Sequence, residues 1–230
     1  MAEIEKLNRR KLPTGIQQID AYLKGGITDQ SINVIGGALA SGKTTLGVII
    51  ANNMVSNGLK VLHIVREDYT SNIALKYVAA QTGTPQHGFK PTIRNVRVGN
   101  ILVTHINFDD SVSKAVRTIL EGEQFDFIII ENIDTPSSLE INRLRSLLET
   151  YNVTILGTAQ ANRPLMDSAL IDFKRPTISG ADLVLTIEKL YEGHEYKNIN
   201  LNILKHRYES DLGFPSAFEL NIDFSGVKID

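Results

Sequence analysis

One eight-residue segment constrains this chain more than any other. Residues 37–44 read Gly-Ala-Leu-Ala-Ser-Gly-Lys-Thr and fit the pattern G-x-x-x-x-G-K-[ST] of a phosphate-binding loop. An apolar run precedes the segment and a helical pattern follows it, as this motif requires. Glycines let backbone N–H groups turn toward a phosphate, and the amino end of the next helix adds partial positive charge. The sequence therefore predicts a nucleoside-triphosphate site on an α/β fold.

The residues of this loop have distinct expected roles. We expect Lys43 to reach the β- and γ-phosphates and the Thr44 hydroxyl to hold Mg²⁺. The predicted cofactors are therefore ATP and Mg²⁺. The predicted nucleotide-binding residues are Gly37, Ala38, Leu39, Ala40, Ser41, Gly42, Lys43, Thr44 and Thr45.

Two acidic positions are candidates for the chemistry around the phosphates. Glu131 follows the apolar run 127–130, where the metal-supporting carboxylate of such sites usually lies, although that residue is usually Asp. Asp134 is the alternative for this role. Glu67 follows a predicted strand that we expect beside the strand of the phosphate loop, and it could polarise the attacking water. The alternative for Glu67 is an exposed loop acid.

Short apolar runs alternate with helical patterns, which is typical of a parallel sheet covered by helices. After residue 188 the pattern changes to a two-residue alternation, which predicts antiparallel strands and a hairpin at 192–197. The fold class is therefore α/β, a mainly parallel twisted sheet flanked by helices with a C-terminal antiparallel extension. We predict strands at 31–35, 60–65, 101–106, 125–130, 153–158, 183–188, 199–205 and 217–222, and helices at 15–23, 43–56, 71–82, 111–121 and 138–151.

Composition excludes several classes of protein. The 230 residues contain no cysteine, which excludes disulfides, thiolate metal sites and a cysteine nucleophile. With 24 basic and 26 acidic residues the net charge is -2, so any contact with nucleic acid must be local. The longest uncharged stretch, 44–59, contains three asparagines and a serine. We therefore expect no membrane segment and a cytoplasmic protein.

Read in order, the motifs resemble the RecA-like ATPase core of DnaB-type hexameric replicative helicases, including the helicase half of phage primase-helicases. This resemblance implies a RecA-like P-loop NTPase domain at 13–230 after a short N-terminal extension at 1–12. Apart from the phosphate loop, its motifs are Thr14-Gly15-Ile16, Ile19-Asp20, Gly25-Gly26 and the segments 61–67, 125–131, 157–163, 180–185 and 203–207.

The resemblance also implies roles for single residues. Glu67 corresponds to the family's catalytic glutamate, and Gln160 corresponds to its γ-phosphate sensor. Lys205 and Arg207 match a Lys-x-Arg pair that enters the ATP site of the neighbouring subunit, where an arginine stabilises charge on the transferring phosphoryl group. Taken alone, Lys205 and Arg207 would be surface charges of an edge strand. A shared site implies a homo-oligomer, a ring of six subunits in this family.

DNA contacts in this family come from loops that line the ring's channel. Here the loop 163–179 is the candidate, with Arg163, Lys174 and Arg175 as the predicted DNA-binding residues. The alternative for Arg163 is a local structural cap. The implied function is an ATP-dependent helicase that moves on single-stranded DNA in replication, in the host cytoplasm if phage-encoded, with a separate primase or loader as a further partner.

Two departures from the family pattern keep other functions open. The loop region before residue 183 is short, and only about eleven residues precede Pro13. These features also fit a RecA- or RadA-like phage recombination ATPase that binds single strands and promotes annealing or pairing. A KaiC-like regulatory ATPase is the third interpretation.

Overall fold

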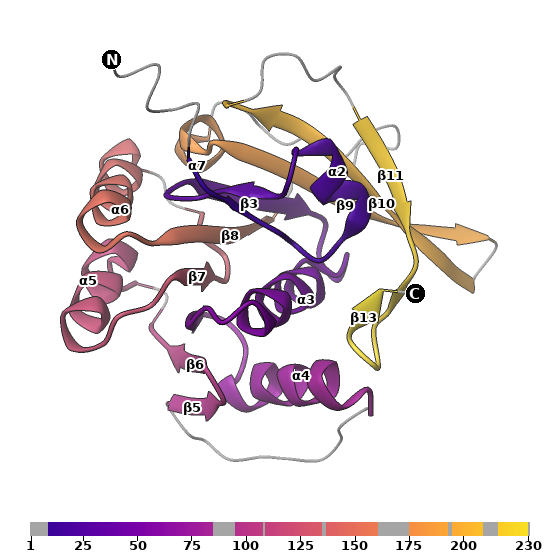
Figure 1. The fold of residues 1–230 in the computed structure, drawn as a ribbon, viewed down its shortest axis with the longest axis horizontal. Helices are drawn as coiled ribbons and strands as arrows, with labels where there is room; N and C mark the ends of the chain where they lie inside the picture. The colour runs from indigo at the N-terminus through magenta and orange to yellow at the C-terminus, as the bar shows by residue number, and fades with distance from the viewer. Residues whose placement is uncertain are drawn as a thin grey trace.

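A single twisted sheet runs through the molecule (Figure 1). The computed structural model describes residues 9–84, 95–107, 109–134, 137–160, 175–192, 195–208 and 216–229. Within these ranges the strands of the sheet are β3 (Ile32–Gly37), β4 (Val61–Val65), β5 (Asn95–Val98), β6 (Ile101–His105), β7 (Phe127–Ile130), β8 (Thr154–Gln160), β9 (Leu183–Glu192), β10 (Glu195–His206) and β11 (Ser216–Leu220). Their order is β11-β10-β9-β3-β8-β7-β4-β6-β5. The inner strands from β9 to β6 are parallel, and β5, β10 and β11 are antiparallel to their neighbours.

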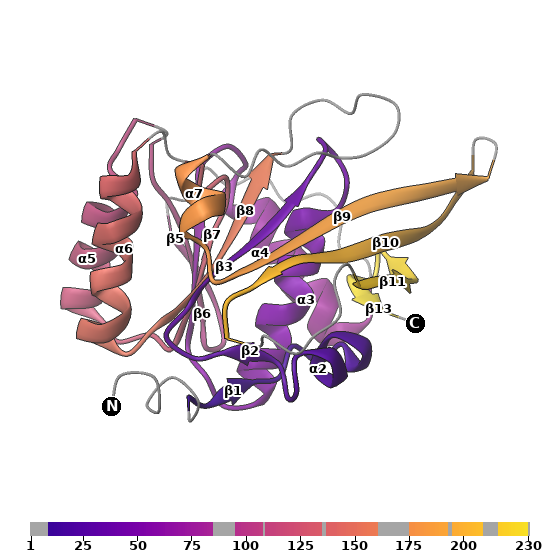
Figure 2. The same ribbon diagram turned by 90° about the horizontal axis from the view of Figure 1, so that it is seen from above.

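Helices cover both faces of this sheet (Figure 2). They are α2 (Gln17–Tyr22), α3 (Lys43–Ser56), α4 (Thr70–Thr82), α5 (Val112–Gly122), α6 (Ser138–Tyr151) and α7 (Pro176–Gly180). Alternate residues of each strand point to opposite faces, so the sheet separates two apolar cores. Along β4, for example, Val61 and Val65 belong to the core under α2, α3 and α4, whereas Leu62 and Ile64 belong to the core under α5, α6 and α7. None of the helices in the described ranges has the length and apolar character needed to cross a lipid bilayer.

The predicted fold class is confirmed, and α3 and α6 have the predicted bounds. The sequence patterns missed β5, α7 and two small antiparallel pairs. These elements have two to five residues each, which is too short for a helical or strand period to be recognised. The small pairs join β1 (Lys11–Leu12) to β2 (Ile27–Thr28) and β12 (Ile222–Asp223) to β13 (Lys228–Ile229).

One prediction about strand neighbours is wrong. We expected the strand before Glu67 to lie beside the strand of the phosphate loop, but β8 and β7 separate β4 from β3. The crossover from β3 through α3 skips two positions, which strands from later in the chain then fill. Because the inner strands are parallel, their carboxyl ends still meet at one edge of the sheet. Residues after β4 therefore remain on the same edge as the phosphate loop.

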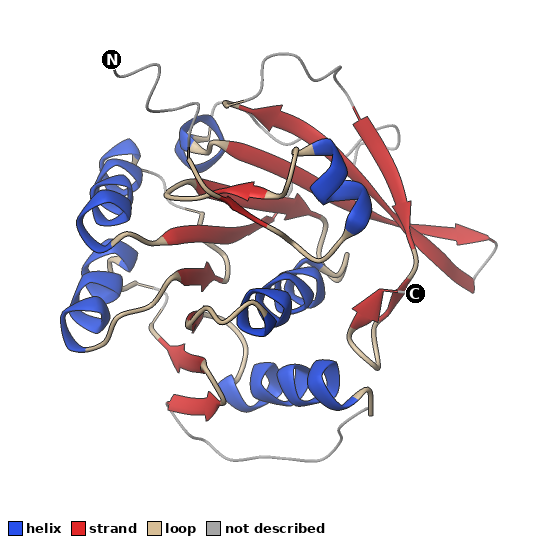
Figure 3. Ribbon diagram, viewed as in Figure 1, coloured by secondary structure: helices blue, strands red, loops and turns tan. Residues whose placement is uncertain are grey.

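The predicted hairpin joins β9 to β10 and extends the sheet beyond its helices (Figure 3). Near its end the rings of Tyr191 and Tyr196 pack edge to face, with centroids 6.4 Å apart. The pairing of β10 with β9 contains two register irregularities, one of them between Ile203 and Lys205.

The motif around Thr14 fixes α2 against α3. The carboxylate of Asp20 accepts hydrogen bonds from the backbone N–H groups of Thr14 and Gly15 and from the Thr14 hydroxyl, at 2.7 to 3.0 Å. The Asn53 amide donates to the carbonyl of Pro13 at 2.9 Å. Gly15 has a φ of 80°, and a Cβ there would lie 2.6 Å from the Asn53 side chain. The spacing of Thr14, Gly15 and Asp20 is thus a packing requirement.

Glu140 joins α5 to α6 at the far face. Its carboxylate accepts hydrogen bonds from the N–H and hydroxyl of Ser113 and from the hydroxyl of Ser111, at 2.7 to 3.0 Å. Burial alone would raise the pKa of Glu140, but the bonds from Ser113 and Ser111 outweigh it and lower the pKa. The ionised carboxylate therefore holds the amino end of α5.

We predict that Glu140→Gln lowers the free energy of unfolding by about 1 kcal/mol at neutral pH, because one charged acceptor is lost. A group with a lowered pKa stabilises the fold above its ordinary value of 4.5 and loses this contribution as pH falls. The difference between variant and parent should therefore shrink in acid denaturation series. Glu149→Gln, an exposed position on the same helix, is the control. Equal stability of parent and Glu140→Gln at pH 7 would contradict the assignment.

Candidate active site

The phosphate loop is shaped by residues in left-handed backbone conformations. Between β3 and α3, Ala40 has a φ of 59° and Gly42 a φ of 101°. A Cβ at Gly37 would lie 2.6 Å from the Ser41 hydroxyl oxygen, and a Cβ at Gly42 would lie 2.5 Å from the ring of Phe224. Space therefore requires both glycines of the motif, and the backbone conformation requires Gly42 as well.

Polar groups of this loop fit a phosphate. Among the described residues, the Ser41 hydroxyl oxygen is buried without a hydrogen-bond partner, and no side chain caps the amino end of α3. The Lys43 ammonium donates to the carbonyls of Gly37 and Ala38, at 3.0 and 2.6 Å. Burial lowers the pKa of Lys43, and the negative charges of Glu131 and Glu67 oppose this shift. A bound phosphate would supply the acceptor and the negative charge that these donors favour.

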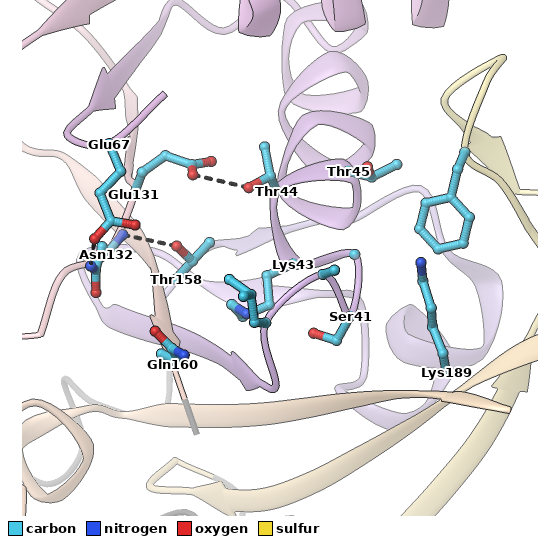
Figure 4. A pocket seen from close by; sticks show the side chains of 14 residues that line it. Ser41, Lys43, Thr44, Thr45, Glu67, Glu131, Asn132, Thr158, Gln160 and Lys189 are labelled. Carbon is cyan, nitrogen blue, oxygen red and sulfur yellow. Dashed lines mark hydrogen bonds between the residues drawn. The ribbon is translucent and has the colours of Figure 1, made fainter. Parts of the chain in front are cut away.

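Glu131 and Asp134, the two candidates for the metal, lie in different surroundings. Thr44 donates a hydrogen bond from its hydroxyl to Glu131 Oε2 at 2.9 Å (Figure 4). Asp134 forms an ion pair with Arg175. Of the two carboxylates, Glu131 is therefore the one that faces the hydroxyl expected to hold Mg²⁺.

Glu67 lies at the same edge of the pocket and is held by a residue that the sequence patterns did not indicate. The Asn132 amide donates to Glu67 Oε1 at 2.6 Å, and the Asn132 backbone N–H donates to the Thr158 hydroxyl at 2.9 Å. Asn132 has a φ of 49°, a conformation that Asn tolerates better than most residues. An Asn directly after Glu131 was the available sequence signal. Through Asn132, the end of β8 is connected to the Glu67 carboxylate.

The opposite end of the pocket is formed by Lys189 and Phe224 (Figure 4). The Lys189 ammonium lies 4.5 Å from the centroid of the Phe224 ring, a cation–π distance. Lys189 comes from β9, and Phe224 follows β12. No sequence pattern indicated this pair, because only the fold brings both residues to the phosphate loop. A ring and an aliphatic lysine stem offer a surface for a nucleobase.

The pocket between these two ends has a volume of about 290 Å³. Ligand pockets commonly measure roughly 300 to 1,000 Å³, so one chain supplies a small site. Gln160, the predicted phosphate sensor, lines the pocket at the end of β8.

The Lys-x-Arg pair lies at the other edge of the sheet. Arg207 directly follows β10 and forms an ion pair of 2.8 Å with the buried Asp182, whose carboxylate also binds Arg145 and the Ile32 N–H. The Lys205 ammonium donates to the carbonyl of Ser179 at 2.7 Å, and burial together with Arg207 lowers its pKa.

This pair is far from the phosphate loop of its own chain. Ile32 begins β3 and Gly37 ends it. Five residue steps of about 3.3 Å therefore separate the level of Arg207 from the loop by roughly 17 Å.

The predicted DNA-binding residues are only partly described. Arg163 and Lys174 lie outside the described residues. Arg175 donates to the carbonyl of Gln160 at 2.6 Å in addition to its ion pair with Asp134. The end of the predicted DNA loop is thus attached to the residue that lines the nucleotide pocket.

This sheet order and phosphate loop define a RecA-like ATPase. No family model matches the chain. The chain is similar in structure to the solved ATPase domain of a DnaB-like helicase, with a TM-score of 0.73, 14% identity and coverage of 99% of this chain and 94% of that one. At the level of the fold, the resemblance to the ATPase core of DnaB-type helicases is confirmed.

Curated relatives have names from DNA repair. The DNA repair and recombination protein RadB of Thermoplasma acidophilum is 25% identical over 220 residues, which is 93% of each protein. The DNA repair protein RadA of Streptococcus pneumoniae is 27% identical over 155 residues, which is 67% of this chain. The chain spans about a third, 32%, of the length of that RadA protein.

We predict that Phe224→Ala weakens ATP binding by about tenfold, because a nucleobase would lose the ring at the end of the pocket. Fluorescent nucleotide titration measures this affinity. Phe218→Leu is the matched control, because Phe218 packs against Tyr22 and does not line the pocket. Unchanged affinity in a folded Phe224→Ala variant would show that the base binds elsewhere.

Proposed function

We propose that this protein hydrolyses ATP at interfaces between identical subunits and uses the cycle to move along single-stranded DNA and separate duplex ahead of it. The observation that carries this proposal is the separation of Arg207 from the phosphate loop of its own chain. Since Arg207 cannot reach its own pocket, an arginine contribution to hydrolysis requires a second subunit. The small pocket of one chain supports the same conclusion.

Each side chain at the pocket has a role in this proposal. Lys43 binds the β- and γ-phosphates, Thr44 and Glu131 hold Mg²⁺, and Glu67 polarises the attacking water. When bound, Mg²⁺ supplies positive charge that neutralises the phosphate oxygens. Arg207 of the neighbouring subunit would leave its ion pair with Asp182 to stabilise the transferring phosphoryl group. Asp182 would remain paired with Arg145.

Coupling to DNA is supported by the contacts of Gln160. This residue lines the nucleotide pocket, and its carbonyl binds Arg175 at the end of the predicted DNA loop. A change in the γ-phosphate contact of Gln160 would therefore reach the loop through a backbone already bonded to it. Arg163 and Lys174 of the same loop remain proposed DNA contacts, repeated around a six-subunit channel.

A recombination function is the second candidate. It is supported by the RadA and RadB relatives, whose names place them in DNA repair and recombination. In that case the same ATP site would control binding and pairing of single strands in filaments or rings, without translocation.

The shared site can be tested by mixing two inactive variants. Lys43→Ala should abolish turnover, and Arg207→Ala should lower hydrolysis about 10³-fold while nucleotide binding persists. In mixed oligomers, some interfaces combine an intact phosphate loop with an intact arginine, so hydrolysis should return when the two proteins are combined. Arg117→Ala, an exposed arginine on α5, is the control and should keep the parent rate. Parental turnover of Arg207→Ala, or no recovery on mixing, would contradict a site completed in trans.

The motor function is tested by electron microscopy of the protein with single-stranded DNA and a non-hydrolysable ATP analogue. We expect six-subunit rings around the strand, together with ATP-dependent unwinding of a forked duplex. Long filaments without unwinding would favour the recombination candidate. Absence of any DNA complex would contradict both.

A further inference from the structure

His63 is a polar residue on an apolar face of the central sheet. It lies in β4 between Val61 and Val65, whose side chains belong to the core under α3 and α4. In the sheet its neighbours are Val103 of β6 and Ile129 of β7, and its side chain is fully buried. A buried polar group at such a position is costly unless hydrogen bonds satisfy it.

Both ring nitrogens of His63 have partners. Nδ1 lies 2.7 Å from the hydroxyl of Tyr77 on α4, and Nε2 lies 3.2 Å from Glu131 Oε1. The other oxygen of Glu131 accepts the hydrogen bond from Thr44. A continuous chain of contacts therefore links the core of the helix face to the hydroxyl expected to hold Mg²⁺.

The direction of these hydrogen bonds follows from their chemistry. An ionised carboxylate can only accept, so His63 donates from Nε2 to Glu131. A neutral imidazole then accepts at Nδ1, which requires Tyr77 to donate its hydroxyl proton. Burial, with a smaller contribution from Glu131, raises the pKa of Tyr77 well above its ordinary value, so the phenol keeps that proton. The chain runs from Tyr77 through His63 to Glu131.

We propose that His63, oriented by Tyr77, is a positioning residue that fixes the Glu131 carboxylate for the metal ion. One oxygen of Glu131 is held by His63, so the other stays directed at Thr44. Groups behind a metal ligand commonly change metal affinity by about 10- to 100-fold when removed. This inference rests on the proposed role of the pocket as a Mg²⁺-nucleotide site.

A purely structural role is the competing explanation, because a His–Tyr pair can also serve only to fill the core. The two explanations differ in what a donor-retaining substitution does. Gln places an N–H group near the position of Nε2, whereas Leu fills similar space without a donor. A positioning role requires that Gln preserves metal binding and that Leu does not.

The experiment measures binding of Mn²⁺, as a spectroscopic probe for the Mg²⁺ site, in the presence of saturating ADP. Electron paramagnetic resonance reports the free Mn²⁺ and does not depend on turnover, DNA or ring formation. We expect His63→Leu to weaken Mn²⁺ binding about tenfold or more and His63→Gln to remain within about threefold of the parent. Tyr77→Phe, which removes only one hydroxyl, should weaken it several-fold. Tyr191→Phe, an exposed tyrosine on β9, is the control for the loss of a hydroxyl.

Several outcomes would overturn the inference. One is parental Mn²⁺ affinity in a folded His63→Leu variant, and another is an equal loss in the Gln and Leu variants. If His63→Leu does not fold, parental affinity in Tyr77→Phe would overturn the inference as well. A parent protein that binds ADP without Mn²⁺, or binds neither, would instead contradict the proposed function together with this inference.

Discussion

The hydrogen bond between Thr44 and Glu131 joins the two parts of the site on which the rest depends. Thr44 lies in the first turn of α3, directly after the phosphate loop, and Glu131 follows β7. The bond therefore fixes the amino end of the helix against a strand that is two positions from β3 in the sheet. Because the inner strands are parallel, every loop at this edge, including those with Glu67 and Gln160, faces the same pocket.

The other edge of the sheet has a different chemistry. There Asp182 is buried and binds two arginines and a backbone N–H group, which makes a rigid base for Arg207. Its position, across the sheet from the phosphate loop, gives one chain two half-sites at opposite edges. Such an arrangement favours assembly in which the edge of one subunit meets the pocket of the next.

Sequence patterns predicted the elements that have long periods or strict spacing. The phosphate loop, α3 and α6 were predicted well because glycine conformations and helical periodicity are local properties. The position of β4 was predicted wrongly, since the order of parallel strands depends on strands that come later in the chain. Asn132, His63, Lys189 and Phe224 carried no clear signal, because none of them is near the phosphate loop in sequence.

By itself, the sequence determined that the chain has a phosphate loop on an α/β fold, with acidic residues after the strands that end near it. These features follow from local backbone geometry and from the alternation of side chains. Only the tertiary structure decided that Glu131 and not Asp134 faces Thr44, that Asn132 holds Glu67, and that Arg207 lies across the sheet. Such pairings depend on strand order and register, which long-range packing sets and no local pattern encodes.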